Sequence, residues 1–235
     1  MKTGNLHILR RFPPDHQTHQ RQLLHSRLTR QECRLLEEGL AGVVRLICDH
    51  WTPAETATIL YRAVTEYLRY DHAAAENTSP QEKQSYTYLG ALFNGTAVCS
   101  GIAQLYFILC QACGIPCQVV EGYAGTEGQE GLHAWVQVRL PDDQGNWVSY
   151  HCDPTWDLLE GKPFQGFRFF LKSDDYFESH QHQWYYAIGA DLGWHKFDRC
   201  PADGRIPAVS RSAVVQVVEQ LKKLRLDQPF LLKNE

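Results

Sequence analysis

The fold is decided by residues 94–114, which read NGTAVCSGIAQLYFILCQACG. The first three residues break regular structure, and apolar side chains then recur at the three- and four-residue spacing of a helix: Ile102, Leu105, Tyr106, Leu109 and Cys113. Gly114 is placed to end this helix, and Pro116 prevents its continuation. The stretch therefore predicts a buried helix that carries Cys99 close to its N-terminus.

The segments after this helix predict an antiparallel sheet. Residues 117–124 are rich in valine and aromatic side chains, as strands are. Residues 132–140 (LHAWVQVRL) alternate, which places His133 on the face opposite the aliphatic side chains. After a turn, PDDQGN, residues 147–153 predict a second strand that folds back on the first, and residues 167–172 (FRFFLK) predict a further strand.

Helices flank the predicted sheet along the chain. Residues 29–48 carry an apolar stripe at helical spacing. The next helix has a clear start, with Thr52 as N-cap, Pro53 at the first helical position and Glu55 completing a capping box. Residues 210–226 predict an amphipathic helix with basic residues in its last turns. This order of elements predicts an α+β domain.

Composition limits the classes of function. A formal net charge of −4 and a pI near 6.3 give no basic surface for nucleic acid. No apolar run reaches the roughly 18 residues that span a bilayer, so we expect no membrane insertion. The N-terminus lacks the apolar core and cleavage site of a signal peptide, which predicts a cytoplasmic protein. In that reducing compartment, we expect the eight cysteines to be thiols.

Cys99, His133 and Asp153 form the candidate chemical group. A thiolate nucleophile requires stabilisation of the anion, a base, and a residue that orients the base. The positive end of the helix dipole at the N-terminus would stabilise the thiolate anion of Cys99. The small residues Ser100 and Gly101 are expected to leave room for a substrate. The strands around PDDQGN fold back so that residue numbers summing to 286 or 287 face each other. In the 286 register, His133 and Asp153 form a cross-strand pair with Cβ atoms about 5 Å apart.

These motifs resemble the transglutaminase-like superfamily in its compact bacterial form: VCSG opening a helix, GLHAWVQV on a strand, and HCDPTWD at the end of the next strand. The resemblance covers about residues 50–180 and implies a papain-like core, in which the helix bearing the nucleophile packs on an antiparallel sheet. It implies a Cys-His-Asp triad, with Cys99 as nucleophile, His133 as base and Asp153 as the orienting residue. The family completes its oxyanion hole with a side chain upstream of the cysteine, and the candidates here are Tyr86, Tyr88 and Asn94.

The resemblance also implies a reaction, namely acyl transfer at a peptide or amide bond through a thioester acyl-enzyme, without a cofactor or a metal. The tryptophan-flanked cysteine and the acidic calcium loop of animal transglutaminases are missing from this sequence. We therefore expect hydrolysis of a peptide or protein amide rather than calcium-dependent crosslinking. Three alternatives stay open: a calcium-independent transamidase, a catalytically silent binding or scaffold module of the same fold, and a structural protein whose cysteines bind metal or sense redox state.

Other residues of chemical interest have simpler interpretations. His151 shares a face with Asp153 and is expected to flank the site as a bystander. Cys110, Cys113 and Cys117 have a spacing found in zinc sites. However, the first two lie in an apolar helix and no second Cys/His pair follows at finger-like spacing, so core packing is expected.

The expected organisation is one catalytic domain with two extensions. Residues 1–28 are polar and without periodicity, which predicts a poorly ordered arm. Residues 29–200 form the catalytic domain, and residues 201–235 form a C-terminal helix that packs on it.

Overall fold

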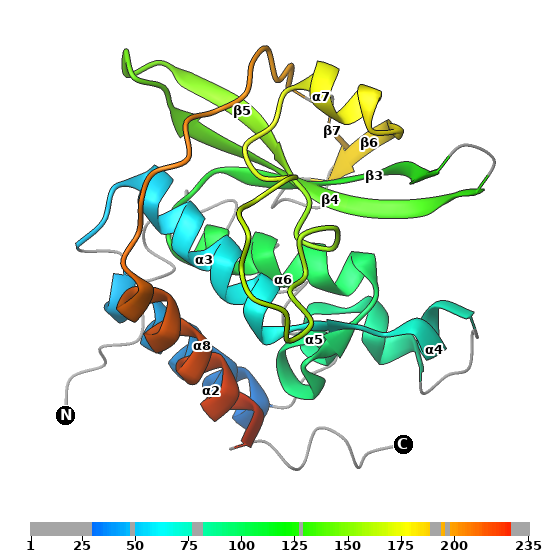
Figure 1. Ribbon diagram of the computed structural model, residues 1–235. Coiled ribbons are helices and arrows are strands. Elements are labelled where there is room, and N and C mark those ends of the chain that lie inside the picture. Colours follow the sequence, from blue (N-terminus) through cyan, green and yellow to red (C-terminus); the bar gives the residue numbers. More distant parts are fainter. Residues whose placement is uncertain are drawn as a thin grey trace.

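The computed structural model describes residues 30–47, 50–76, 82–126, 129–188, 194–195 and 198–226. The arm expected at residues 1–28 lies outside these ranges. Within them, the chain forms a layer of helices beneath a curled antiparallel sheet (Figure 1). This arrangement confirms the predicted α+β fold class.

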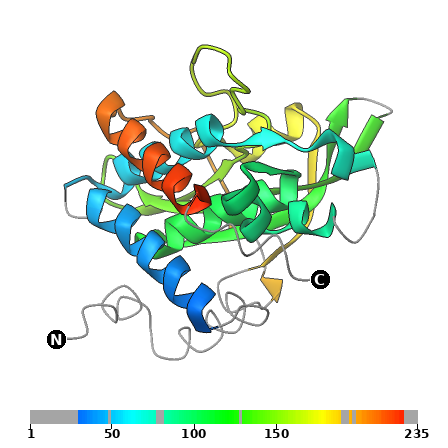
Figure 2. The ribbon, with the colours of Figure 1, turned by 90° about the horizontal axis from the view of Figure 1, so that it is seen from below.

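Four longer helices make up most of the helical layer. α3 (Pro53–Tyr67) and α6 (Cys99–Ala112) lie against the sheet. α2 (Arg30–Ile47) and α8 (Arg211–Leu226) pack together on the side away from the sheet, and α8 also packs on α3 (Figures 1 and 2). The shorter elements near α6 are α4 (His72–Glu76), the 3-10 turn η3 (Glu82–Tyr86) and α5 (Tyr88–Asn94).

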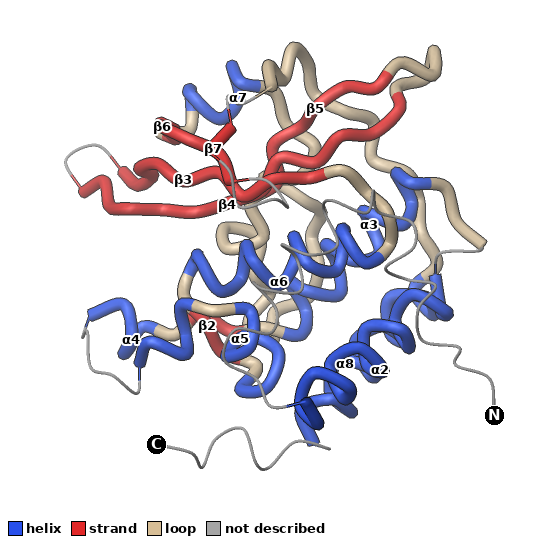
Figure 3. Tube along the Cα trace, turned by 180° about the vertical axis from the view of Figure 1, so that it is seen from behind, coloured by secondary structure: helices blue, strands red, loops and turns tan. Residues whose placement is uncertain are grey.

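The main sheet has the strand order β5–β4–β3–β6–β7, and each neighbouring pair is antiparallel. Its strands are β3 (Cys117–Thr126), β4 (Gln129–Pro141), β5 (Trp147–Cys152), β6 (His182–Ile188) and β7 (Trp194–His195). A small helix, α7 (Asp174–Ser179), lies on the sheet face opposite the helical layer (Figure 3). A separate parallel pair, β1 (Arg69–Tyr70) and β2 (Thr96–Ala97), connects the end of α3 with the residues before α6.

β4 divides the core into two parts, as its alternating pattern predicts. Its aliphatic side chains belong to the larger core, which the helices share: Ala134, Val136, Val138 and Leu140. Trp135 is fully buried on the other face, in a smaller cluster with Val120, Phe169, Phe177 and Ala187. Burial of a large apolar side chain contributes about 1.5–3 kcal/mol, so packing on both faces fixes β4 in position.

Two glycines outside α6, one before its start and one after its end, mark its limits. Gly95 adopts the left-handed conformation, with φ 69°, and closes α5 just before the new helix begins. Gly114 adopts a similar conformation, with φ 74°, after α6 has ended at Ala112. Four of the five residues of the predicted apolar stripe are fully buried, with Ile102, Leu105, Tyr106 and Leu109 each 0% exposed, whereas Cys113 is half-buried and follows the last residue of the helix. α6 is thus a core helix, and its first residue, Cys99, lies half-buried at the edge of that core.

The capping box predicted at the start of α3 is confirmed. The Glu55 N–H donates to Thr52 Oγ1 at 3.3 Å, and the Thr52 N–H donates to Glu55 Oε2 at 2.8 Å. These two bonds satisfy N–H groups that have no partner within the helix. Pro53 occupies the first turn, as predicted.

The strand predicted at residues 167–172 is wrong. Only Lys172 forms a bridge there, with His151. The backbone N–H groups of Arg168 and Phe169 donate to the carboxylate of Asp157 at 3.0 and 2.9 Å instead of to a neighbouring strand. An aromatic-rich composition favours strand locally, but this carboxylate takes the donors that a ladder requires.

Two further sequence expectations, on membrane-spanning helices and on free thiols, can be compared with the described residues. Among the described helices, none has the length and apolar character needed to cross a bilayer. Six cysteines whose side chains the structure describes are free thiols: Cys99, Cys110, Cys113, Cys117, Cys152 and Cys200.

Candidate active site

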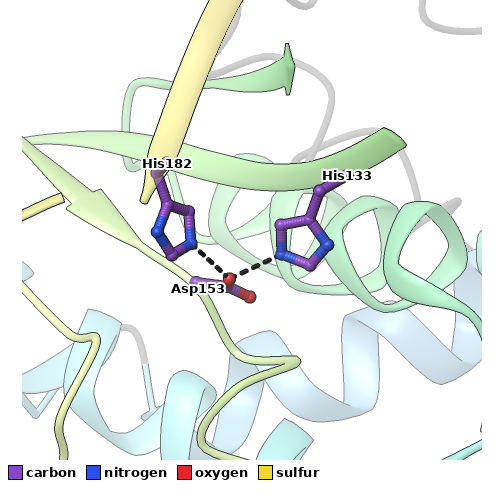
Figure 4. A group of neighbouring side chains, drawn as sticks. All are labelled: His133, Asp153 and His182. Carbon is purple, nitrogen blue, oxygen red and sulfur yellow. Dashed lines mark hydrogen bonds and ion pairs between the residues drawn. The ribbon is translucent and has the colours of Figure 1, made fainter. Parts of the chain in front are cut away.

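The three candidate residues come from three different elements. Cys99 is the first residue of α6, His133 lies in β4, and Asp153 directly follows the last residue of β5. The structure brings two of them into direct contact, since His133 Nε2 lies 2.7 Å from Asp153 Oδ2 (Figure 4). The carboxylate of Asp153 is 0% exposed, and the imidazole of His133 is 8% exposed.

The predicted register of this contact is wrong by two residues. Val136 pairs with Cys152 and Gln137 with His151, so paired residue numbers sum to 288 rather than 286. Side-chain direction alternates along a strand, so a shift of two residues keeps Asp153 on the side that His133 faces. Asp153 has already left the ladder, and its N–H donates to the Phe169 carbonyl at 2.8 Å. The two side chains therefore meet just beyond the paired part of the strands.

On its other side, His133 lies close enough to the Cys99 thiol for the two groups to interact. Its second ring nitrogen points away from Asp153, which leaves it available for this contact (Figure 4). Burial lowers the pKa of His133, but the charge and hydrogen bond of Asp153, followed by those of Cys99, outweigh burial and raise the pKa from 6.5 to about 10. At neutral pH, His133 is therefore an imidazolium placed between a carboxylate and a thiol.

Asp153 is ionised although no water reaches it. Burial acts to raise its pKa, but the charge and hydrogen bond of His133, together with those of a second histidine, His182, hold the pKa well below the usual range. His182 Nε2 lies 3.1 Å from Asp153 Oδ2, and the Thr155 N–H donates to Oδ1 at 2.9 Å. Every oxygen of this carboxylate has a donor, as a buried anion requires.

Sequence reasoning missed His182, which is the first residue of β6 and fully buried. Its position depends on an irregularity in the pairing of β3 with β6, between Glu121 and Gly122. A Cβ on Gly122 would lie 1.9 Å from the Gln183 carbonyl oxygen, so only glycine allows β6 to approach this closely. A glycine inside a valine-rich strand indicates that another segment approaches the backbone closely at that point. The sequence around Gly122 did not identify which strand approaches it.

A second missed contact joins the helical layer to the site. Tyr61 on α3 is fully buried, and its hydroxyl lies 2.7 Å from the Asp153 carbonyl oxygen and 2.8 Å from Asp157 Oδ2. The pKa of Tyr61 is raised well above 10, first by burial and then by these carboxylates, so the hydroxyl keeps its proton. The turn from Asp153 to Asp157 is therefore held from below by α3.

Gly101 does not leave space for a substrate, contrary to expectation. A Cβ on Gly101 would lie 2.5 Å from the Ser85 carbonyl oxygen, so this glycine allows η3 to pack against α6. The hydroxyl of Ser100 donates to the Tyr86 carbonyl at 2.9 Å. These small residues fasten the N-terminal end of α6 to the preceding turn.

The structure does not single out any of the three upstream candidates for an oxyanion donor. The Tyr86 hydroxyl donates to the Ala74 carbonyl at 3.1 Å, Tyr88 is buried at the start of α5, and Asn94 ends that helix. Tyr70 of β1, which sequence reasoning missed, is close enough to Cys99 for the two side chains to interact electrostatically. The pKa of Tyr70 is raised to about 12, first by burial and then by Cys99, Tyr86 and Asp153.

His151 belongs to a separate buried network beneath α7. Trp135 Nε1 donates to His151 Nδ1 at 2.9 Å, so the ring proton of the neutral imidazole is on Nε2, which lies 3.0 Å from Asp174 Oδ1. Burial lowers the pKa of His151 and keeps it neutral.

Two groups in the described part of the chain bring metal-ligand types together: His133, Asp153 and His182, and His151, Asp174 and Cys200. In the second group, a metal on Nε2 would require the ring proton on Nδ1, which already accepts the Trp135 N–H. Burial raises the pKa of the Cys200 thiol, which disfavours the thiolate that a metal binds. In the first group, direct hydrogen bonds already join the ligand atoms.

Comparison with known proteins places this site in a family context. Residues 45–152 match the family model described as the transglutaminase-like superfamily. The match confirms the resemblance over these residues; it contains Cys99 and His133 and ends one residue before Asp153. A search of the curated proteins found no match.

Proposed function

From this transglutaminase-like core, we propose that the protein is a cysteine-dependent enzyme that hydrolyses a peptide or protein amide through a thioester acyl-enzyme on Cys99. The observation that carries the proposal is the contact between Asp153 and His133, with 2.7 Å between carboxylate and imidazole, beside Cys99, which lies close enough to the imidazole to raise its pKa. This group provides the base, its orienting group and the nucleophile that thiol catalysis requires.

The first half of the reaction forms the acyl-enzyme. The Cys99 thiolate attacks the amide carbonyl carbon, and the oxygen takes the negative charge. Val98 makes no side-chain cap at the start of α6, so N–H groups of the first turn are available to donate to this oxyanion. His133 transfers its proton to the amide nitrogen, the C–N bond breaks, and the amine leaves.

The second half returns the enzyme to its starting state. Neutral His133 removes a proton from a water molecule while the water oxygen attacks the thioester carbon. The C–S bond breaks, the carboxylic acid leaves, and the Cys99 thiolate again faces an imidazolium. The carboxylate of Asp153 holds the ring in one orientation through both halves and stabilises its charged form.

We also propose that Tyr70 is the side chain that assists the oxyanion, in place of the three candidates considered from sequence. The pKa of Tyr70, raised to about 12, keeps its hydroxyl protonated and able to donate. Water is the proposed acyl acceptor because the sequence carries no acidic calcium loop, and the proposed setting is the reducing cytoplasm, where a reactive thiol persists.

Thiol labelling tests the proposal without knowledge of the natural substrate. Purified protein is treated with a small amount of iodoacetamide at pH 6, and mass spectrometry measures the rate at each cysteine. We expect Cys99 to react much faster than Cys113, which is similarly half-buried at the other end of the same helix. His133→Ala should remove this preference, because it removes the imidazolium partner. Equal, slow labelling of all cysteines in the wild type would refute the proposal.

A peptide library with and without an added primary amine then separates the two acceptors. Hydrolysis predicts cleaved peptides in both cases, and a transamidase would instead give amine adducts. A silent module would give neither.

A further inference from the structure

His182 has an unusual set of hydrogen-bond partners. Its Nε2 lies 3.1 Å from Asp153 Oδ2, and its Nδ1 lies 3.1 Å from the carbonyl oxygen of His180. Figure 4 shows the ring opposite His133, with both rings directed at the same carboxylate oxygen. Asp153 is thus held between two imidazoles, of which the three-residue mechanism uses only one.

Both partners of His182 are acceptors. A backbone carbonyl has no proton to give, and the carboxyl group of Asp153 is ionised because its pKa lies well below the usual range. A neutral imidazole has one N–H and one bare nitrogen, so it would leave one of these acceptors facing a lone pair. Only the imidazolium, with a proton on each nitrogen, satisfies both contacts.

The surroundings of the ring also favour a cation. Four aromatic rings have their centroids within 6 Å of the His182 centroid: Trp156 and Phe177 at 4.4 Å, Trp135 at 5.2 Å and Phe169 at 5.6 Å. Aromatic rings at such distances attract cations through their π-electrons. No water reaches the ring, which is 0% exposed, so this attraction is not weakened by solvent.

We propose that His182 is a positioning residue in its doubly protonated form, and that it holds Asp153 from the side opposite His133. The protonation state stands on the hydrogen bonds and the aromatic surroundings of the ring, whereas its importance for Cys99 rests on the proposed function. The proposed site is thus a chain of four residues: Cys99, His133, Asp153 and His182. In this chain, His182 orients the carboxylate that orients His133.

The other ionisable groups that face this chain keep constant charge near neutral pH. Burial raises the pKa values of Tyr61 on α3 and Tyr70 on β1, so both remain neutral. Burial lowers the pKa of His151 on β5, which also remains neutral. The carboxyl of Asp157 accepts hydrogen bonds from Tyr61 and from the backbone of Arg168 and Phe169 and does not contact either imidazole.

The direct test counts the protons on the His182 ring. A proton–nitrogen correlation spectrum of the uniformly labelled protein at pH 7 should show two ring N–H signals that disappear together in His182→Gln. One signal, from a neutral ring, would overturn the proposal. So would a stoichiometric divalent metal, found by elemental analysis of the untreated protein and lost in the same variant, because a metal-bound nitrogen carries no proton.

Two variants test the positioning role through Cys99. His182→Gln keeps a side-chain N–H that can reach Asp153, and we expect labelling of Cys99 at pH 6 within about threefold of wild type. His182→Phe fits the aromatic surroundings but removes the donor, and we expect a loss of about tenfold or more, the usual effect of a lost hydrogen bond to a charged group.

His180→Gln is the matched control. The His180 side chain stacks on Tyr176 with ring centroids 4.0 Å apart, and only its backbone carbonyl reaches His182, so labelling should be unchanged. Equal labelling in wild type and His182→Phe would overturn the positioning role. Failure of selective labelling in the wild type itself would instead count against the proposed function, so the two failures are distinguishable.

Discussion

Replacement of Asp153 by asparagine should remove a pH-dependent part of the stability of the fold. The pKa of His133 is raised from 6.5 to about 10 in the folded chain. At about 1.4 kcal/mol per pH unit, this difference corresponds to about 5 kcal/mol of preferential stabilisation of the imidazolium. Asparagine keeps the shape of the side chain but has no charge, so His133 would lose the largest influence that raises its pKa, and only Cys99 would oppose the lowering by burial.

The sign of the effect follows from linkage. A histidine whose pKa is higher in the folded state stabilises the fold fully below its unfolded pKa of 6.5, and this contribution is lost as pH rises through about 10. Asp153→Asn lacks the contribution, so the difference in unfolding free energy between wild type and variant should be largest near pH 6. It should shrink by about 3–5 kcal/mol as pH approaches 10. Cysteines and tyrosines that titrate in this range contribute to both proteins and cancel in the comparison.

The measurement is urea unfolding followed by circular dichroism at several pH values from 6 to 10. Asp157→Asn is the matched control, because this carboxyl is buried in the same turn but bonds to Tyr61 and backbone N–H groups rather than to an imidazole. It should lower stability by a similar amount at every pH in this range. A difference between wild type and Asp153→Asn that stays constant from pH 6 to 10 would refute the coupling of His133 to Asp153.

Four further predictions follow from individual contacts. Gly122→Ala should lower the free energy of unfolding in urea by about 2–4 kcal/mol and slow labelling of Cys99, because its Cβ would lie 1.9 Å from a carbonyl oxygen of β6. Gly131→Ala should have neither effect, because no atom lies within 4 Å of the added Cβ. Thr52→Ala should cost about 1 kcal/mol through loss of the capping box, with labelling of Cys99 unchanged. Tyr70→Phe should leave labelling intact but slow peptide hydrolysis about 100-fold, as loss of an oxyanion donor does. Below pH 4 the unfolding free energy should fall in wild type and less so in Asp153→Asn, because the lowered pKa of Asp153 stabilises the fold above its unfolded value and this contribution is lost as pH falls.

The helix that carries Cys99 could be predicted because its signals are local. Gly95 and Gly114 take the left-handed conformations that end helices, and the four stripe residues within the helix are buried as their spacing indicated. The same holds for the start of α3, where Thr52 and Glu55 satisfy each other within one turn.

The contact between His133 and Asp153 could be predicted in kind but not in register. A loop of six residues between the strands allows several registers, and the observed pairs sum to 288. The predicted contact between His133 and Asp153 is nevertheless present, because the observed register differs from the predicted one by an even number of residues. An odd difference would have turned the two side chains to opposite faces.

His182 could not be found from the sequence because its place depends on distant pairing. It reaches Asp153 only after residues 153–171 have looped under the sheet and β6 has paired with β3 at an irregular point. The segment FRFFLK failed for a related reason, since the Asp157 carboxylate competes for its backbone donors and no local pattern encodes that competition.

The way in which Asp153 is held has a consequence for the chain during synthesis. Its carbonyl oxygen meets a tyrosine 92 positions earlier, and its carboxylate meets histidines 20 positions earlier and 29 positions later. A growing polypeptide therefore cannot complete this arrangement until residue 182 has left the ribosome. Until then, the contacts that hold Asp153 are incomplete, and the orientation of His133 beside position 99 is not yet fixed from both sides.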